Sequence, residues 1–96
     1  MAFRFEWDSR KAAANISKHG VSFDEASTVF DDRLALIFDD EFHSTDEVRE
    51  LIIGHSVNNR LLLVFFVEHP GELIRLISAR VATKKEQQDY ENYPDS

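Results

Sequence analysis

Four cationic side chains stand close together near the carboxyl end of the chain. Arg75, Arg80, Lys84 and Lys85 lie within eleven residues that contain no acid, and the next carboxylate is Glu86. Guanidinium groups match the oxygens of phosphate in a two-pronged fashion. In a protein of net charge −7, such a local excess of positive charge predicts an anion-binding site and favours RNA as its ligand.

The chain also holds side chains that can cleave RNA by acid–base chemistry. A base removes the proton of the ribose 2′-hydroxyl, cations stabilise the charge on the phosphate, and an acid protonates the leaving oxygen. Beside Arg75 and Arg80, the candidates for these roles are His19, Glu47, Arg49 and Tyr90. DNA lacks the 2′-hydroxyl, so this route acts on RNA alone. Further RNA contacts are predicted for Lys18, Lys84 and Lys85.

Each candidate also has a structural interpretation, which the sequence leaves open. Arg75 and Arg49 can form ion pairs instead of holding a phosphate. A charged His19 would stabilise the carboxyl end of a helix through the helix dipole. Tyr90 can pack against the sheet, and Lys84 can be a solvated helix residue. The glutamates expected within reach of Arg75 are Glu47, Glu50 and Glu68.

Several classes of site are excluded or unsupported by the composition. The absence of cysteine excludes disulfides, zinc–thiolate sites and thiol nucleophiles. The four histidines lie in four different predicted elements without metal-ligand spacing, so neither a metal nor a cofactor is predicted. The longest apolar run, Leu61–Val67, is too short to cross a bilayer. We therefore expect a cytoplasmic protein without a membrane segment.

The negative charge is concentrated in one segment. Residues 31–47 carry seven acids and one base, a net charge of −6, whereas the rest of the chain has a net charge of −1. Such a segment repels nucleic acid locally and attracts a basic protein. The alternative is a solvated loop with no partner.

The elements that would position these groups follow from periodicity and capping signals. Phe3–Trp7 alternates as a strand. Asp8 is a predicted N-cap for a helix over Ser9–His19 that ends at Gly20. In this helix Lys11, Asn15 and Lys18 form a polar stripe. Ser22 begins a second helix, in which Glu25 completes a capping box.

The remainder of the chain predicts four strands, one helix and a tail. Thr83 and Glu86 open the helix through a second capping box. Tight turns favour antiparallel pairing of successive strands. The order β-α-α-β-β-β-β-α predicts one α+β domain over residues 1–96, with an antiparallel sheet covered on one face by the leading helices. The strands are Leu34–Phe38, Val48–Val57, Arg60–His69 and Glu72–Ala79, and Asp89–Ser96 is predicted to be a frayed tail.

The last strand presents a difficulty for a site that uses both of its arginines. Strict alternation puts Arg75 on the face of Ile77 and Ala79 and puts Arg80 on the opposite face. A shared site therefore requires a twist or a bulge near Ser78.

Taken together, the motifs resemble those of the BrnT family of bacterial type II toxins, which is grouped with the RelE-like ribonucleases. The resemblance runs from about Phe3 to Tyr90, and it depends on the order and spacing of several short motifs. These are FEWD at Phe5–Asp8, Asn15 with KHGV at Lys18–Val21 and Phe23, VFDD at Val29–Asp32, EVR at Glu47–Arg49, IIGHS at Ile52–Ser56 and IRLISAR-x-AT-x-x-E-x-x-x-Y at Ile74–Tyr90.

The resemblance implies a RelE-like fold and an endoribonuclease that arrests growth until a cognate antitoxin neutralises it. That antitoxin is expected to carry a ribbon-helix-helix DNA-binding half, so promoter DNA is contacted only through the antitoxin. Because such antitoxins are often basic, we expect docking at Asp39, Asp40 and Glu41.

Two departures keep an alternative open. Gln87 and Gln88 stand where relatives tend to be basic, and the net charge of −7 is unusual for a protein that binds RNA. The alternative function is a non-catalytic binding module, or a decayed toxin, that acts only in the complex with its antitoxin. A DNA-binding protein is the weakest candidate, since no helix-turn-helix pattern or basic helix is present.

Overall fold

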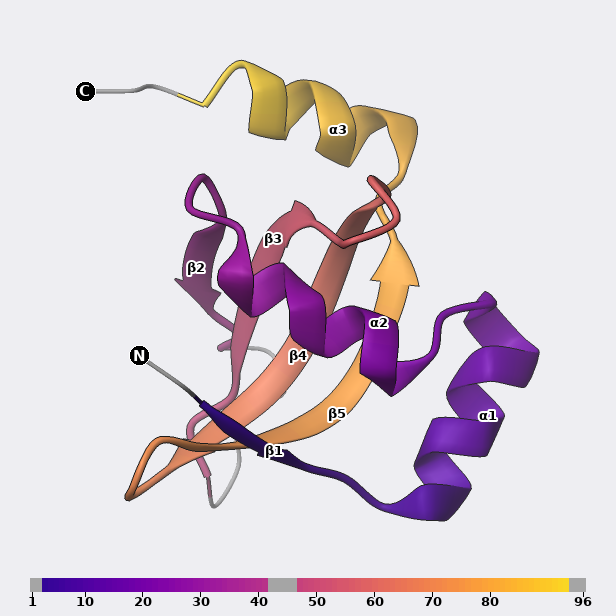
Figure 1. The fold of residues 1–96 in the computed structure, drawn as a ribbon. Coiled ribbons are helices and arrows are strands. Elements are labelled where there is room, and N and C mark those ends of the chain that lie inside the picture. Colours follow the sequence, from indigo (N-terminus) through magenta and orange to yellow (C-terminus); the bar gives the residue numbers. More distant parts are fainter. Residues whose placement is uncertain (1–2, 42–46, 94–96) are drawn as a thin grey trace.

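The computed structural model describes residues 3–41 and 47–93. It confirms the mixed α+β class, with one sheet and helices at both ends of the chain (Figure 1). The elements are β1 (Arg4–Glu6), α1 (Ser9–His19), α2 (Phe23–Ser27), the 3-10 helix η1 (Thr28–Asp31), β2 (Leu36–Asp39), β3 (Glu50–His55), β4 (Leu61–His69), β5 (Leu73–Val81) and α3 (Lys84–Glu91).

The five strands form a sheet in the order β1-β5-β4-β3-β2. Strands β2 to β5 pair antiparallel in succession, as the tight turns predict. Strand β1, however, pairs parallel to β5, with Arg4 opposite Leu73 and Glu6 opposite Arg75. The prediction of a purely antiparallel sheet was therefore wrong. Turn residues determine the pairing only of strands that follow one another, and β1 joins the sheet beside the last strand, far along the chain.

Local capping signals determine the first helix. The carboxylate of Asp8 accepts hydrogen bonds from the backbone N–H groups of Arg10 (2.8 Å) and Lys11 (3.2 Å). At the other end Gly20 adopts the left-handed conformation, with φ of 68°, which glycine reaches without a steric penalty. The predicted bounds of α1 are confirmed.

The capping box predicted for Ser22 and Glu25 is only half formed. The Ser22 hydroxyl accepts a hydrogen bond from the backbone N–H of Glu25 at 3.0 Å. The Glu25 carboxylate does not return to the helix start but accepts hydrogen bonds from Ser56 and Arg60. Tertiary partners thus replace the local partner that the sequence predicts. The box formed by Thr83 and Glu86, in contrast, is complete.

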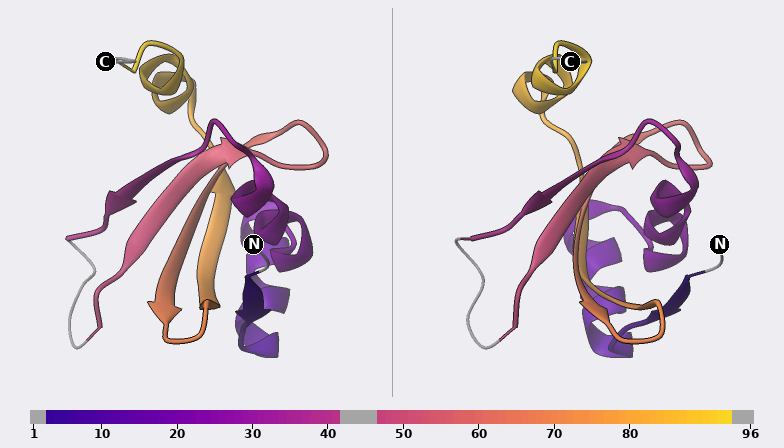
Figure 2. Two further views of the ribbon diagram at one scale, coloured as in Figure 1. Left: turned by 60° about the vertical axis from the view of Figure 1, so that its left-hand side comes forward. Right: turned by 90° about the vertical axis from the view of Figure 1, so that its left-hand side faces the viewer.

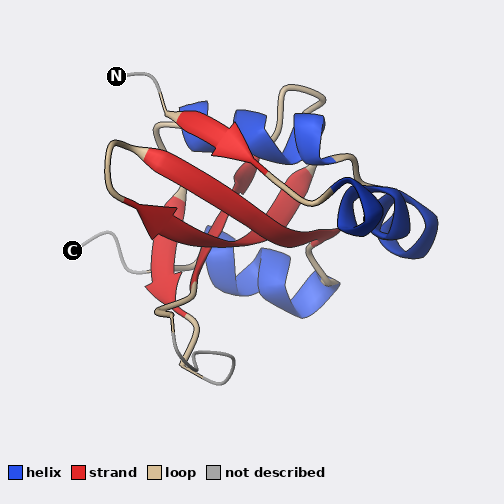
Figure 3. Ribbon diagram, turned by 90° about the horizontal axis from the view of Figure 1, so that it is seen from below, coloured by secondary structure: helices blue, strands red, loops and turns tan. Residues whose placement is uncertain are grey.

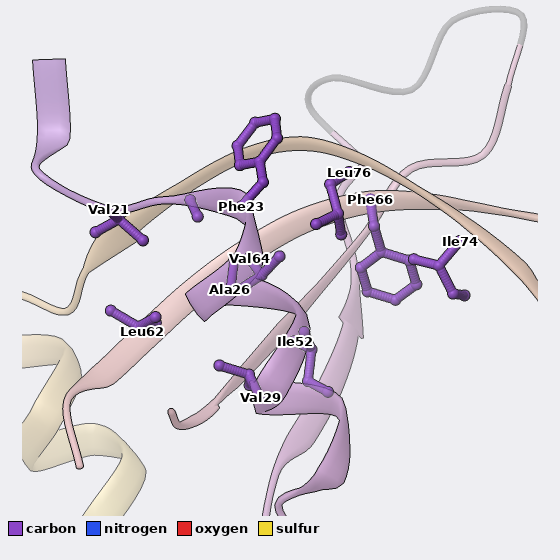
Figure 4. Packing of buried hydrophobic residues seen from close by; sticks show 11 residues of the cluster. Val21, Phe23, Ala26, Val29, Ile52, Leu62, Val64, Phe66, Ile74 and Leu76 are labelled. Atoms are coloured by element: carbon purple, nitrogen blue, oxygen red, sulfur yellow. The ribbon is translucent and has the colours of Figure 1, made fainter. Parts of the chain in front are cut away.

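The main core lies between the sheet and the elements α1, α2 and η1 (Figures 2 and 4). Trp7 meets Phe23 edge-on at 5.8 Å between ring centroids, and Phe30 meets Phe66 at 5.0 Å. The fully enclosed side chains of this core are Val21, Phe23, Ala26, Val29, Ile52, Leu62, Val64, Phe66, Ile74, Leu76 and Ala79.

A smaller apolar cluster lies on the other face of the sheet. Its buried members are Ile53, Leu61 and Leu63, and Phe65 and Tyr90 pack against it. Helix α3 therefore lies on the side of the sheet opposite α2 (Figure 3). It covers only one end of this face, and we call the remainder the open face.

The frayed tail was predicted to begin at Asp89, which is too early in the chain. Helix α3 continues to Glu91, and the ring of Tyr93 packs edge-on against Phe38 at 5.7 Å. These contacts keep Asp89–Glu91 helical, and residues 94–96 lie outside the described residues. Within the described part of the chain, no helix is both long and apolar enough to span a membrane.

Candidate active site

A β-bulge in β5 resolves the difficulty with its two arginines. Phe65 of β4 pairs with Ser78, but the next residue, Phe66, pairs with Leu76, so Ile77 is an extra residue in β5. The insertion shifts the alternation by one residue. Leu76 and Ala79 therefore both enter the main core, while Arg75 and Arg80 both lie on the open face. The arrangement expected from strict alternation was wrong, and the bulge that a shared site requires is present.

Arg75 is held by a glutamate that the sequence does not indicate. Its Nη1 donates to Oε2 of Glu6 at 3.1 Å, because Glu6 of β1 lies directly opposite Arg75 in the parallel ladder. The predicted partners Glu47, Glu50 and Glu68 were wrong, since that prediction took no account of β1 beside β5. The Arg75 side chain is 38% exposed, so the ion pair leaves part of the guanidinium open to solvent.

Arg80 connects β5 to α3. Its guanidinium donates two hydrogen bonds to Glu86, at 2.7 and 2.8 Å. The same carboxylate accepts the backbone N–H of Thr83 at 2.9 Å, as its part of the capping box. The hydrogen bonds from Arg80 are the main cause that lowers the pKa of Glu86 to about 2. Arg80 therefore has a structural role, and it keeps 32% of its side chain exposed.

Two neighbouring hollows lie around the bulge, and together we call them the bulge groove. Ile77 and Ser78 line both of them. The first hollow, of about 180 Å³, lies between α1 and β5, and its remaining lining residues are Lys11, Ala14, Asn15, Lys18 and His19. The second, of about 120 Å³, is also lined by Asp40, Arg49 and Phe65. The groove thus has cationic side chains on both sides of the bulge.

Asn15 places α1 beside the groove. Its side-chain amide donates to the carbonyl of Ala79 at 2.8 Å and accepts the N–H of Ala79 at 3.0 Å. It also donates to the carbonyl of Val21 at 2.9 Å. Asn15 is the buried member of the predicted polar stripe, and all three residues of the stripe line the first hollow. The amide takes the place of a neighbouring strand at the edge of β5, beyond the end of β1.

The predicted catalytic residues are only partly brought together. Exposed His19 lines the first hollow and Arg49 lines the second. Glu47 is also exposed, but it lies 3.8 Å from His69 and does not line the groove. The Tyr90 hydroxyl donates to the carbonyl of Leu34 at 3.1 Å. Burial, with the charge of Asp32, raises the pKa of Tyr90, and the side chain lines a separate apolar hollow under α3.

The remaining predicted residues lie at other places on the surface. Lys84 and Lys85 are exposed on α3, and Lys85 pairs with Asp89 at 3.2 Å. Of the predicted docking residues, Asp39 and Glu41 are exposed, whereas Asp40 is only 7% exposed and lines the groove. Among the described residues no group of three or more histidines and carboxylates is placed to hold a metal ion.

Sequence reasoning missed three residues of the groove. Lys11 was assigned to a polar stripe but to no site, Phe65 was assigned to no site, and Ser78 was noted only as the position of a bulge. The i, i+7 spacing of Lys11 and Lys18 on one helix face was the available signal. No sequence signal placed Phe65 and Ser78 opposite that helix face.

Comparison with known proteins decides the family. A family profile described as "Ribonuclease toxin, BrnT, of type II toxin-antitoxin system" matches residues 7–86. The chain belongs to the BrnT family. Among solved structures, it is similar to the crystal structure of the Brucella abortus ribonuclease toxin BrnT. The match has 25% sequence identity and a TM-score of 0.66, and covers 86% of this chain and 100% of that chain.

BrnT proteins are ribonuclease toxins of type II toxin-antitoxin systems. The resemblance drawn from the short motifs is therefore confirmed, and an antitoxin is the partner that the family implies. A comparison with curated proteins gave no match. The grouping with RelE-like ribonucleases stays a prediction.

Proposed function

We propose that this BrnT-family toxin is an endoribonuclease that cleaves RNA through attack of the ribose 2′-hydroxyl on the adjacent phosphate, without a metal ion. The observation that supports this most strongly is the bulge groove. It gathers the imidazole of His19 and the cations Lys18 and Arg49 around a bulge on the open face.

Each of these groups has a chemical role in the proposal. His19 is the proposed proton acceptor or donor, because histidine is the side chain that most often carries out general acid–base catalysis. Arg49 and Lys18 stabilise the negative charge that develops on the phosphate. Arg75 and Arg80 flank the bulge on β5 and add positive charge, although each already holds a glutamate.

The proposed regulation follows from the family and the charge distribution. A cognate antitoxin with a ribbon-helix-helix half neutralises the toxin and contacts promoter DNA, and the toxin reaches DNA only through it. The exposed acids Asp39 and Glu41 are the proposed docking residues. Asp40 is left out of this surface because it is buried.

Cleavage of matched oligonucleotides tests the mechanism. We expect the purified protein to cut single-stranded RNA in the presence of EDTA and to leave DNA of the same sequence intact. One 2′-deoxy substitution at the cut position should abolish cleavage there. His19→Ala and Arg49→Ala should lose activity, whereas Arg33→Ala, at an exposed loop position, should retain it. Cleavage of the DNA, or loss of activity in EDTA with recovery on adding magnesium, would refute the mechanism.

The ion pairs of Arg75 and Arg80 favour the second candidate function, a non-catalytic binding module or a decayed toxin. Two arginines engaged by Glu6 and Glu86 are less available to phosphate, as expected for a binding module or a decayed toxin. Expression without the antitoxin separates the two functions. Growth arrest with RNA fragmentation supports the ribonuclease, and normal growth with intact RNA supports the binding module.

A further inference from the structure

We propose that the bulge groove binds one nucleotide unit of single-stranded RNA in a defined orientation, with Lys11 and Lys18 on a phosphate and Phe65 against the base. This assignment rests on the proposed ribonuclease function and moves the phosphate site from the joint between β5 and α3 to the rim of α1. Figure 1 shows that α1 and the joint lie at different places along β5.

The two lysines form the cationic rim of the first hollow. They lie seven residues apart on α1, which is two helical turns and therefore one face, and both line the hollow. Among the described residues no ion pair joins either lysine to a carboxylate. Arg75, Arg80 and Lys85, in contrast, are each paired with an acid. Lys84 of α3 is exposed as well, but it does not line the groove, so Lys11 and Lys18 are the lysines placed to hold an anion there.

The second hollow suits a base. The half-buried ring of Phe65 and the side chain of Ile77 give it an apolar surface, and Arg49, Ser78 and the buried Asp40 supply its polar lining. Stacking of a base on an aromatic ring contributes about 1–3 kcal/mol and tolerates any sequence. Single-stranded RNA can turn a base toward such a surface, whereas a duplex keeps its bases stacked inside.

The bulge joins the two subsites. Because Ile77 and Ser78 line both hollows, a nucleotide that crosses β5 at this point can reach Lys11 and Lys18 with its phosphate and Phe65 with its base. The same crossing places the linkage between His19 on one side and Arg49 on the other. The proposed phosphate and base subsites therefore lie on either side of the proposed chemistry.

Binding of a non-cleavable RNA tests the assignment. The probe is a short, fluorescently labelled, fully 2′-O-methylated single strand, titrated by anisotropy at several KCl concentrations. For Lys11→Gln/Lys18→Gln we expect the slope of log affinity against log salt to become shallower by about 0.7, because the two lysines hold one phosphate and each phosphate neutralised on a single strand contributes about 0.7. For Phe65→Leu we expect about tenfold weaker binding with an unchanged slope, because stacking involves no counterion.

Two further variants define the outcomes. Arg10→Gln/Arg33→Gln removes the same charge at exposed positions outside the groove and should bind as the native chain does. Lys84→Gln/Lys85→Gln tests the joint between β5 and α3. If that pair changes the slope while the Lys11/Lys18 pair does not, or if all three pairs change it equally, the assignment is overturned. Absence of binding by the native chain overturns it as well.

The assay also separates this assignment from the proposed function. Because the probe cannot be cut, a chain that binds it as expected but cleaves no RNA refutes only the ribonuclease chemistry. A native chain that cleaves RNA, together with a Lys11/Lys18 variant of normal slope and affinity, refutes only the nucleotide site. Circular dichroism melts of each variant exclude unfolding as the cause, and these lysines are exposed.

Discussion

Two carboxylates, Glu25 and Glu86, are each held by one arginine at a position where a helix meets the sheet. Glu25 accepts hydrogen bonds from Arg60 and Ser56, and Glu86 accepts two from Arg80. In each case the hydrogen bonds from the arginine are the main cause of a pKa lowered to about 2. Both acids therefore stabilise the fold only while they are ionised.

The sign of the resulting pH dependence follows from these values. A carboxyl whose pKa falls from 4.5 to about 2 on folding contributes stability above pH 4.5, and that stability is lost as the pH falls toward 2. We expect Glu25→Gln to lower the free energy of unfolding at pH 7 by about 2 kcal/mol, since charged hydrogen bonds are removed. The variant should also lose less stability than the native chain between pH 5 and pH 3.

Urea unfolding of both chains at pH 7, 5 and 3 measures these effects. Asp24→Asn is the control, because Asp24 lies beside Glu25 on α2 but is exposed. An equal pH dependence in native chain and Glu25→Gln would mean that Glu25 is not the titrating group.

At the scale of elements, the side chain of Asn15 links α1 to β5 by hydrogen bonds. The buried amide of Asn15 satisfies both the N–H and the carbonyl of Ala79, where β5 has no neighbouring strand. The position of α1, and with it the rim of the bulge groove, therefore depends on a hydrogen-bonded contact rather than on apolar burial alone.

Removal of this contact should be costly. Asn15→Ala leaves two buried backbone groups of Ala79 without their partner, so we expect the free energy of unfolding to fall by about 3 kcal/mol. Urea unfolding measures the change. Ser17→Ala, at an exposed position of the same helix, should change it by less than about 0.5 kcal/mol. A small effect at Asn15 would show that water replaces the amide at no cost.

The bulge in β5 is the second feature at this scale. Deletion of Ile77 should make the β4–β5 ladder regular, because Ser78 would follow Leu76 directly in register and both arginines would keep their face. We expect the deleted chain to fold but to lose RNA cleavage by about 100-fold, since small displacements of catalytic groups have effects of this size. The rate of cleavage of a labelled RNA strand measures the loss.

A matched substitution distinguishes the effect of the bulge on activity from the effect of the Ile77 side chain. Ile77→Ala keeps the extra residue and removes only part of the groove lining, so it should retain more activity than the deletion. If the deletion is as active as the native chain, the bulge serves folding rather than the site.

At the scale of the whole molecule, most of the negative charge lies in one segment of the chain, and the cations of the groove lie mainly on α1. The acid-rich segment at residues 31–47 has a net charge of −6, and Asp39 and Glu41 are exposed within its described part. The bulge groove carries its cations on α1 and at Arg49, the residue just before β3. Asp40 of the same segment lines the groove, so the two surfaces adjoin there, and a polyanion and a basic partner would be attracted to neighbouring parts of the molecule.

This separation predicts the kinetics of antitoxin binding. For Asp39→Lys/Glu41→Lys we expect association with the cognate antitoxin to slow by about tenfold at low salt, and the difference to shrink as salt screens it. Stopped-flow or surface-based association rates measure the effect. Asp24→Lys/Glu91→Lys makes the same charge change at exposed positions elsewhere. Equal slowing in both pairs would indicate an effect of net charge and exclude a docking surface at Asp39 and Glu41.

Local chemistry determined much of this protein from sequence alone. Capping residues determined α1, because Asp8 and Gly20 act within one helical turn, and tight turns determined the antiparallel meander from β2 to β5. The motifs were sufficient to indicate the BrnT family, since a family signature is a property of residue order. His19, Lys18 and Arg49 were also identified as candidates from their side-chain chemistry.

Only the tertiary structure decided which candidates lie together. The partner of Arg75 depends on β1 joining the last strand, a contact across 69 residues that no local pattern encodes. Asn15 hydrogen-bonds the backbone of Ala79 because β1 ends before it could pair with that residue. Phe65 lines a hollow because Ile77 is the extra residue of the bulge in the neighbouring strand. Helix caps and tight turns are formed by neighbours in the chain, whereas a groove is formed by elements that meet only after folding.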